Sequence, residues 1–461
     1  MTWLQTSTAG LLILCALAIA LLLVLIIKVK LEPFIALLIT GLVLGIAAGL
    51  SVNELVGTAF TSRDSILEKG FGGILGHIAP IIGLGTVLGA ILERSGGADV
   101  LSKRLLGVFG ERLAPVAMGL VGLIFGIPVF FDIGIFVLAP LVYVTAKRGG
   151  KSLVLYALPV LAGLSMTHAF LPPHPGPTAV AGLLHVDLGW IILIGLACGL
   201  PAFAVSGILW PMWIAPRVPV SVPDDFIPGE LEQEEDAQKE VSLGLVLFII
   251  AVPLVLILGA TFGTVLLQPG TALNVLTFFG TPAVALTIAV LLAFFLLGIR
   301  RGQSATELAR LTGESLRPVG MILLVVGAGA FFGAVISATG VGKALADTLS
   351  SIGLPVLVSA YLISCALRLA QGSATVALVA TGGIIGPLLE GGDYSQPQLA
   401  VIAIAIASGS IIASHVNDGG FWIVAKYFNM TVKQTLQTWT VLETILSIVG
   451  FLMASLLWVI L

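Results

Sequence analysis

The sequence predicts an all-α polytopic membrane protein, and three observations lead to this class. Of the 461 residues, 58% are hydrophobic and only 10% are Asp, Glu, Lys or Arg, whereas a typical soluble protein has about 25% charged residues. The mean hydropathy is +1.14. Apolar runs recur along the whole chain, and most approach the roughly 20 residues that a helix needs to cross a bilayer. This composition excludes a soluble enzyme and a disordered chain.

The apolar runs define the expected elements in order. We interpret residues 11–27 as a retained first span, because no Lys or Arg precedes the run while Lys28 and Lys30 follow it. The positive-inside rule then places the N-terminus outside. Further candidate spans are 33–50, 71–92, 187–211, 242–262, 273–299, 318–338 and 438–460. Four other runs are interrupted by Gly, Pro or polar residues, at 114–146, 152–184, 353–389 and 397–428.

The two halves of the chain share a glycine pattern. Gly83, Gly85, Gly89, Ala90 and Gly96 align without a gap with Gly327, Gly329, Gly333, Ala334 and Gly340. Each copy is followed by two of the interrupted runs, so the pattern indicates an internal repeat. The first copy would cover residues 1–216 and the second residues 242–461. An acidic linker, 217–241, would join them on the cytoplasmic side.

Charge then predicts the topology. Basic residues flank both ends of 114–146, so this segment should enter and leave on the cytoplasmic side as a re-entrant hairpin. Few charges flank 353–389, which should be the matching hairpin from the external side. The segments 152–184 and 397–428 should be broken helices that cross in opposite directions. The result is an inverted repeat of five crossings plus one hairpin per half, with both termini external, which is typical of secondary transporters.

Polar residues of the first half gather in its interrupted runs. Asp132 lies mid-way in 114–146, and a charge at the bilayer centre costs about 2.5–3.5 kcal/mol. It either takes part in substrate or proton chemistry or makes an internal hydrogen bond. Four prolines between 172 and 177 cannot lie inside a helix, so one helix should end near His168 and another begin near Pro177. The new N-terminus would suit an anion, and His168 and His174 would donate to it or relay a proton.

The second half offers a matching set. Arg368 in 353–389 could bind a substrate carboxylate or pair with Asp132 or Asp418. Beyond it, Ser373 and Thr375 offer hydroxyl groups after Gly372, which permits a tight turn.

The last interrupted run, 397–428, carries polar and glycine residues from Ser414 to Gly420. Asn417 and Asp418 suit the hydroxyl groups of a sugar-like ligand, and Asp418 is a second candidate proton carrier.

At these segments the sequence resembles the gluconate permease (GntP) family. The resemblance rests on THAFLPPHPGPT at 167–178, QGSATVA at 371–377 and SHVND at 414–418, and it extends over the whole chain. It implies proton-coupled import of gluconate or related aldonates across a bacterial inner membrane. Other branches of the family carry D-serine. It also implies paired hairpins and a homodimer.

Together these observations predict a secondary active transporter of gluconate or a similar polyhydroxy carboxylate, with no enzyme activity, cofactor, metal or nucleic-acid partner. The expected substrate-binding residues are Thr167, His168, His174, Arg368, Gln371, Ser373, Thr375, His415 and Asn417, and the expected proton-coupling residues are Asp132 and Asp418. Three alternatives stay open at this point. They are a transporter of D-serine or another small acid, sodium coupling, and a membrane-embedded hydrolase that uses His168, His174 and Asp132.

Overall fold

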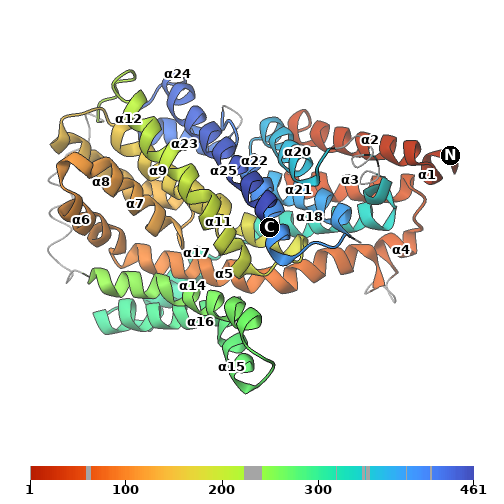
Figure 1. The fold of residues 1–461 in the computed structure, drawn as a ribbon, viewed down its shortest axis with the longest axis horizontal. Coiled ribbons are helices and arrows are strands. Elements are labelled where there is room, and N and C mark those ends of the chain that lie inside the picture. Colours follow the sequence, from red (N-terminus) through yellow and green to blue (C-terminus); the bar gives the residue numbers. More distant parts are fainter. Residues whose placement is uncertain are drawn as a thin grey trace.

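The regular structure of the chain is helical (Figure 1). The computed structural model describes residues 2–58, 64–222, 241–317, 319–344, 348, 354–390, 392–415 and 418–461. No strand occurs within these ranges. The helices up to residue 222 are α1 (Thr2–Thr6), α2 (Thr8–Ile27), α3 (Pro33–Ala47), α4 (Val52–Val56), α5 (Gly73–Arg94), α6 (Gly97–Phe109), α7 (Ala114–Gly126), α8 (Phe131–Gly149), α9 (Val154–Phe170), α10 (Pro175–Leu183), α11 (Leu188–Phe203) and α12 (Trp210–Ile214).

The helices after residue 241 follow a similar order. They are α14 (Leu243–Leu266), α15 (Thr271–Gly280), α16 (Pro282–Ala293), α17 (Ala305–Ser315), α18 (Val319–Ala338), α20 (Val356–Gln371), α21 (Ala374–Leu389), α22 (Gln396–Ser410), α23 (Gly419–Tyr427), α24 (Val432–Thr435) and α25 (Val441–Ile460). In the described residues, four π-helical turns extend these elements. They are η2 (Glu68–Gly72) before α5, η4 (Ala204–Leu209) after α11, η5 (Phe294–Gly298) after α16 and η7 (Leu436–Thr440) before α25. Of the predicted acidic linker, residues 223–240 lie outside the described ranges.

The described residues include eight helices that are long and apolar enough to cross a membrane. They are Thr8–Ile26, Glu68–Arg94, Val154–Leu183, Leu188–Ile214, Leu243–Leu266, Pro282–Arg301, Ala305–Ala338 and Val432–Ile460. Each overlaps a crossing that the sequence predicts, so the all-α multi-pass class is confirmed. The other two predicted crossings are shorter: α3 has 15 residues, and the segment 397–428 divides into α22 and α23.

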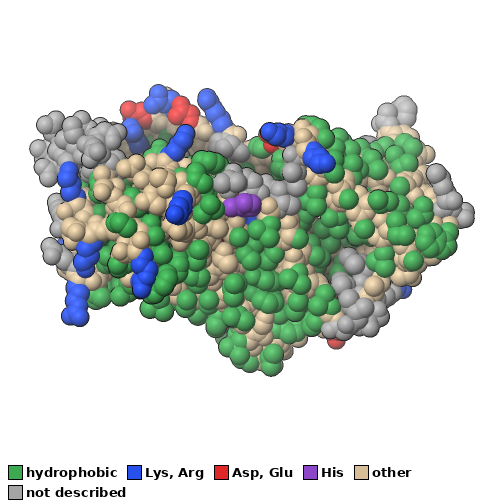
Figure 2. Space-filling model, turned by 90° about the horizontal axis from the view of Figure 1, so that it is seen from above, with side chains coloured by type: hydrophobic (Ala, Val, Ile, Leu, Met, Phe, Trp, Pro, Cys, Tyr) green, Lys and Arg blue, Asp and Glu red, His purple; other side chains and the backbone are tan. Residues whose placement is uncertain are grey.

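Hydrophobic side chains dominate the outer surface. They cover most of the face shown in Figure 2, and the Lys and Arg side chains gather towards one end of it. Val255, Phe262 and Leu291 on α14 and α16 are each more than 40% exposed. A soluble protein rarely exposes such a large apolar area, whereas a lipid bilayer solvates it.

In each of the four interrupted segments the helix breaks at the expected place. The segment 114–146 becomes α7 and α8, and 353–389 becomes α20 and α21 with Gly372 between them at φ +84°. The break in 152–184 lies between Phe170 and Pro175. Whether these pairs are re-entrant, and on which side each enters, stays a prediction, as do the orientation of the termini and the boundaries of the halves.

One predicted span begins at the wrong residue, since the membrane-crossing helix is Pro282–Arg301. The sequence predicts a single crossing at 273–299, but the structure ends α15 at Gly280 and begins α16 at Pro282. Thr281 between them has φ −57° and ψ 125°. This conformation follows from steric repulsion by the next proline, which disfavours the helical region for the preceding residue.

The packing of the two halves is reciprocal. Helix α3 of the first half packs on α18 of the second, and α16 of the second half packs on α5 of the first (Figure 1). Within each half, α7 packs on α9 and α20 packs on α22. The aligned glycines Gly96 and Gly340 adopt nearly the same left-handed backbone, at φ +76° and +73°. An internal repeat predicts such correspondences.

The aligned glycines also permit close helix contacts. A Cβ atom at Gly89 of α5 would lie 2.3 Å from the carbonyl oxygen of Pro128, in the turn between α7 and α8. A Cβ atom at Gly333 of α18 would lie 2.7 Å from the carbonyl oxygen of Gly383 in α21. These glycines let α5 and α18 approach the interrupted segments closely enough to hold them in position.

Candidate functional site

Two short helices from opposite halves begin side by side. Along α10 and α21, Gly176 lies against Leu378 and Leu183 lies against Gly382, so the two helices run parallel. Their N-termini therefore lie at the same end. Both helices owe their start to local sequence, since Pro175 occupies the first turn of α10 and the Ser373 hydroxyl accepts from the backbone N–H of Val376 in α21.

A second pair of helix N-termini faces the first. Helix α8 packs on α23, and a Cβ atom at Gly420 would lie 3.4 Å from the Phe131 ring. The rings of Phe130 and His174, which precede α8 and α10, have centroids 5.9 Å apart. The first turns of four helices thus converge. The free backbone N–H groups and the positive dipole end of each helix favour an anion there.

Arg368 and Asp418 form a buried ion pair at this convergence. Their side chains are 4% and 14% exposed. One guanidinium nitrogen donates to Oδ2 of Asp418 and another donates to the carbonyl oxygen of Gly372. The sequence left three partners open for Arg368, and the structure pairs it with Asp418. The pair joins the end of α20 to the start of α23, and we call it the Arg–Asp pair.

Asp418 also caps α23 and anchors a wider network. Its Oδ1 accepts from the backbone N–H of Gly420 at 2.9 Å, the usual role of aspartate at a helix N-cap. Its Oδ2 accepts from the Ser414 hydroxyl, and Ser414 Oγ accepts from Trp439 Nε1 at 2.8 Å. With the Arg–Asp pair, three donors therefore stabilise the Asp418 carboxylate.

The two predicted histidines lie together. The His168 and His174 ring centroids are 5.0 Å apart in an edge-to-face arrangement. His174 Nε2 lies 2.6 Å from the carbonyl oxygen of Gly126, so this nitrogen donates. His168 Nδ1 is buried without a hydrogen-bond partner in the described part of the chain. His168 is also close enough to Asp418 and Arg368 to interact with their charges.

Asp132 is the exposed carboxylate of this region. It occupies the first turn of α8 and its side chain is exposed. It lies close enough to Asp418 for the two carboxylates to repel one another.

The remaining predicted residues have varied positions. Ser373 and Thr375 are partly buried in the first turn of α21. His415 lies in the break before α23, with Nδ1 3.1 Å from the carbonyl oxygen of Ala413. Thr167 is fully buried, and its hydroxyl donates to two carbonyl oxygens of its own helix at 3.0 Å. The side chain of Gln371 and all of Asn417 lie outside the described residues.

Sequence reasoning missed part of this site. Trp439 and Ser165 carried no signal, because tryptophan and serine are common in membrane helices. Glu443 is a lone carboxyl group in an apolar span, a pattern that fits a polar packing contact and a functional group equally well. The structure buries Glu443 to 2% exposure, one helical turn after Thr440, whose hydroxyl donates to the carbonyl oxygen of Ser414. Within the described ranges, no group of three or more His, Cys, Asp or Glu side chains could hold a metal ion.

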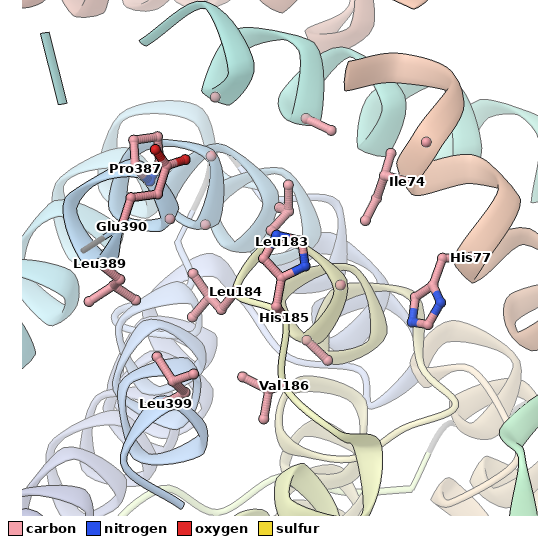
Figure 3. Close-up of a pocket in the computed structure, with 18 of the residues that line it drawn as sticks. Ile74, His77, Leu183, Leu184, His185, Val186, Pro387, Leu389, Glu390 and Leu399 are labelled. Carbon is pink, nitrogen blue, oxygen red and sulfur yellow. The ribbon is translucent and has the colours of Figure 1, made fainter. Parts of the chain in front are cut away.

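A cavity lies at the other end of α10 and α21 (Figure 3). It has a volume of about 1060 Å³, and His77, His185 and Glu390 contribute to its lining. Its wall includes the C-terminal parts of α10 and α21, whereas their N-termini reach the Arg–Asp pair. Helix α10 has nine residues and is about 13 Å long at 1.5 Å per residue, with the cavity at its C-terminal end.

The apolar helices and the buried polar convergence define a multi-pass membrane transport protein, since polar backbone ends inside a membrane occur where a solute or cavity satisfies them. Residues 10–460 match the profile of the GntP family permease. The chain belongs to this family, and it is an inner-membrane permease rather than an enzyme.

Known relatives cover nearly the whole chain. The inner membrane permease YgbN of Escherichia coli is 39% identical, with 99% of this chain and 98% of the relative aligned. The low-affinity gluconate transporter of Escherichia coli is 37% identical over 92% of both chains. The crystal structure of the Alcanivorax borkumensis YdaH transporter has a similar fold, with a TM-score of 0.61 and 16% identity over 93% of this chain and 96% of that chain.

Proposed function

We propose that the protein imports gluconate or a related aldonate by secondary active transport, and that proton entry drives this uptake. The observation that carries the proposal is the convergence of four helix N-termini, two from each half, on the Arg–Asp pair. A relative of 37% identity is a low-affinity gluconate transporter. An aldonate consists of one carboxylate and a chain of hydroxyl groups, and this region supplies donors for both.

The carboxylate would bind where positive potential is highest. Arg368 presents a planar fork of donors that matches a carboxylate, and the first turns of α10 and α21 add backbone N–H groups. Ser373, Thr375 and His415 lie in the adjacent turns and would meet the hydroxyl groups. The two histidines would close the opposite side, where His168 Nδ1 has a free hydrogen-bonding position.

Alternating access would expose this site to each side in turn. The cavity of Figure 3 lies at one end of α10 and α21, and the site lies at the other. In the arrangement described here, packed helices separate the two. A movement of α10 and α21 relative to α5 and α18 would open a path, because these four helices line the cavity.

Uptake into liposomes tests the proposal. Purified protein would be reconstituted, and labelled gluconate uptake measured with an inward proton gradient, with the same gradient plus a protonophore, and with a sodium gradient at clamped pH. Accumulation that needs the proton gradient and disappears with the protonophore is the expected result. Accumulation driven by sodium alone, or competition by D-serine and none by gluconate, would refute this assignment.

A further inference from the structure

Glu443 is a buried carboxyl group that is not among the residues proposed to contact the substrate. It lies in the first turn of α25 with 2% of its surface exposed. The hydroxyl of Ser165 in α9 is near enough to act as a donor to its carboxyl group. Its Oε1 atom is buried and has no hydrogen-bond partner within the described residues. A carboxyl group in this position is therefore only partly satisfied.

The charged surroundings of Glu443 are those of the candidate site. Glu443 lies one helical turn after Trp439 and Thr440, which both donate to Ser414. Ser414 in turn donates to Asp418 of the Arg–Asp pair. Of the elements packed on α25, neither α22, η4 nor η7 contains a charged or titratable residue, α11 contains only the thiol of Cys198, and α9 contains Tyr156 and His168. Arg368 already donates to Asp418, so the described residues offer Glu443 no cation of its own.

The two carboxyl groups beside Arg368 thus differ in their support. Asp418 receives donors from Arg368, Ser414 and the backbone of Gly420, which favour its ionised form. Glu443 has the Ser165 hydroxyl as its donor and an unpartnered oxygen. Because an ionised group that is buried with little hydrogen bonding costs several kcal/mol, the neutral, protonated form of Glu443 fits this environment.

We propose that Glu443 is the group that binds the coupled proton, an inference that rests on the proposed function. A proton on Glu443 removes a negative charge beside Arg368 and so favours binding of the substrate carboxylate. Loss of that proton on the cytoplasmic side restores the repulsion and favours substrate release. Binding of proton and substrate are then linked by one coupling free energy. The proton comes from water outside and leaves to water inside, and no covalent bond of the substrate changes.

The substitution Glu443→Gln tests this role because it retains the shape and removes the titration. Wild-type and variant liposomes would be compared for gluconate accumulation under an inward proton gradient, and for exchange of labelled against unlabelled gluconate without a gradient. We expect Glu443→Gln to exchange gluconate. Under the proton gradient, however, the gluconate concentration inside the liposomes should rise only to the outside concentration. Glu93→Gln on α5 is the matched control, because Glu93 lies in a membrane-spanning helix but outside the site, and it should accumulate as the wild type does.

The outcomes separate the inference from the proposed function. A wild-type protein without proton-driven uptake would overturn both. Normal accumulation by Glu443→Gln would overturn the inference alone. Loss of both exchange and accumulation, in a variant that purifies as folded protein, would also overturn it.

A second variant applies if Glu443→Gln does not fold. Ser165→Ala removes the hydroxyl donor of Glu443 but retains its carboxyl group. Because the carboxylate then has one stabilising hydrogen bond fewer, we expect the external pH at half-maximal uptake to rise by about one unit. An unchanged pH midpoint in Ser165→Ala would overturn the inference.

Discussion

Removing Asp418 should destabilise the protein far more than removing Arg368, although each substitution breaks the same ion pair. The Arg368 side chain is 4% exposed, and its other contact is the Gly372 carbonyl oxygen. Asp418→Ala therefore leaves a buried cation without its partner, which costs about 3–5 kcal/mol. It also removes the N-cap of α23, which adds about 1 kcal/mol. The expected decrease in the free energy of unfolding is about 4–6 kcal/mol.

Arg368→Met has a smaller expected effect. Asp418 is 14% exposed and retains the Ser414 hydroxyl and the Gly420 N–H group. The substitution removes one charge-assisted hydrogen bond, which is worth about 1.5–3 kcal/mol. The double variant Asp418→Ala/Arg368→Met removes both charges, and replacing a buried ion pair by apolar groups is often close to neutral. We therefore expect the double variant to be about 3 kcal/mol more stable than Asp418→Ala alone.

Equilibrium unfolding measures this difference. The three variants and the wild type would be titrated with sodium dodecyl sulfate in mixed micelles, and unfolding followed by tryptophan fluorescence. The second substitution should partly restore the midpoint that Asp418→Ala lowers. If the two effects simply added, so that the double variant were the least stable, Arg368 would not be the uncompensated charge and the reasoning would be refuted.

Three further predictions follow from single positions. Gly89→Ala places a Cβ atom 2.3 Å from a carbonyl oxygen and should lower the free energy of unfolding by about 2 kcal/mol. Its control is Gly76→Ala on the same helix, which meets open space and should raise the free energy of unfolding by up to about 1 kcal/mol. Equal stabilities of the two variants would contradict the close contact at Gly89. Gly96→Ala and Gly340→Ala should each lower the free energy of unfolding by about 1–2 kcal/mol, because both positions have a left-handed backbone; an effect at only one of them would count against a matched pair. Asp132→Asn removes the exposed carboxylate that would pass protons between water and the site, so gradient-driven uptake in liposomes should be lost; wild-type accumulation by this variant would exclude that role.

The helix breaks could be predicted because local rules set them. The prolines between 172 and 177 remove backbone donors and clash with the preceding turn, so no tertiary contact is needed to end a helix there. The observed ends at Phe170 and Pro175 lie within two residues of the expected ones. Gly372, at φ +84°, divides α20 from α21 for a similarly local reason.

The break before Pro282 could not be predicted in the same way. A single proline in an apolar run is tolerated in membrane helices, and Pro253 does lie inside α14. Proline sterics favour a break at Thr281 without requiring one, and packing adds to them, since a Cβ atom at Gly280 would lie 2.4 Å from the carbonyl oxygen of Leu256. That contact belongs to the folded α14–α15 pair and leaves no trace in the composition of either run.

The candidate site could be predicted as a set of residue types but not as a set of partners. Arg368 had three possible anions, and the choice of Asp418 depends on how α20 lies against the break before α23, 50 residues away. The Thr167 hydroxyl bonds the backbone of its own helix, a common state for threonine in apolar helices, and its contact with a ligand stays a prediction. The place of Glu443 in the site could not be predicted, because one polar residue in an apolar span forms no sequence pattern.

The convergence of helices from both halves has a consequence for molecular recognition. The scaffold is nearly balanced, because each half contributes two helix starts, but its side chains are not. The first half contributes His168 and His174, and the second contributes the Arg–Asp pair and Glu443. The four converging helix starts therefore carry imidazole groups on one side and a guanidinium group on the other. A ligand with two unlike ends would adopt one orientation in it, head towards Arg368 and tail towards the histidines, and neither half alone contains enough of the surface to hold it.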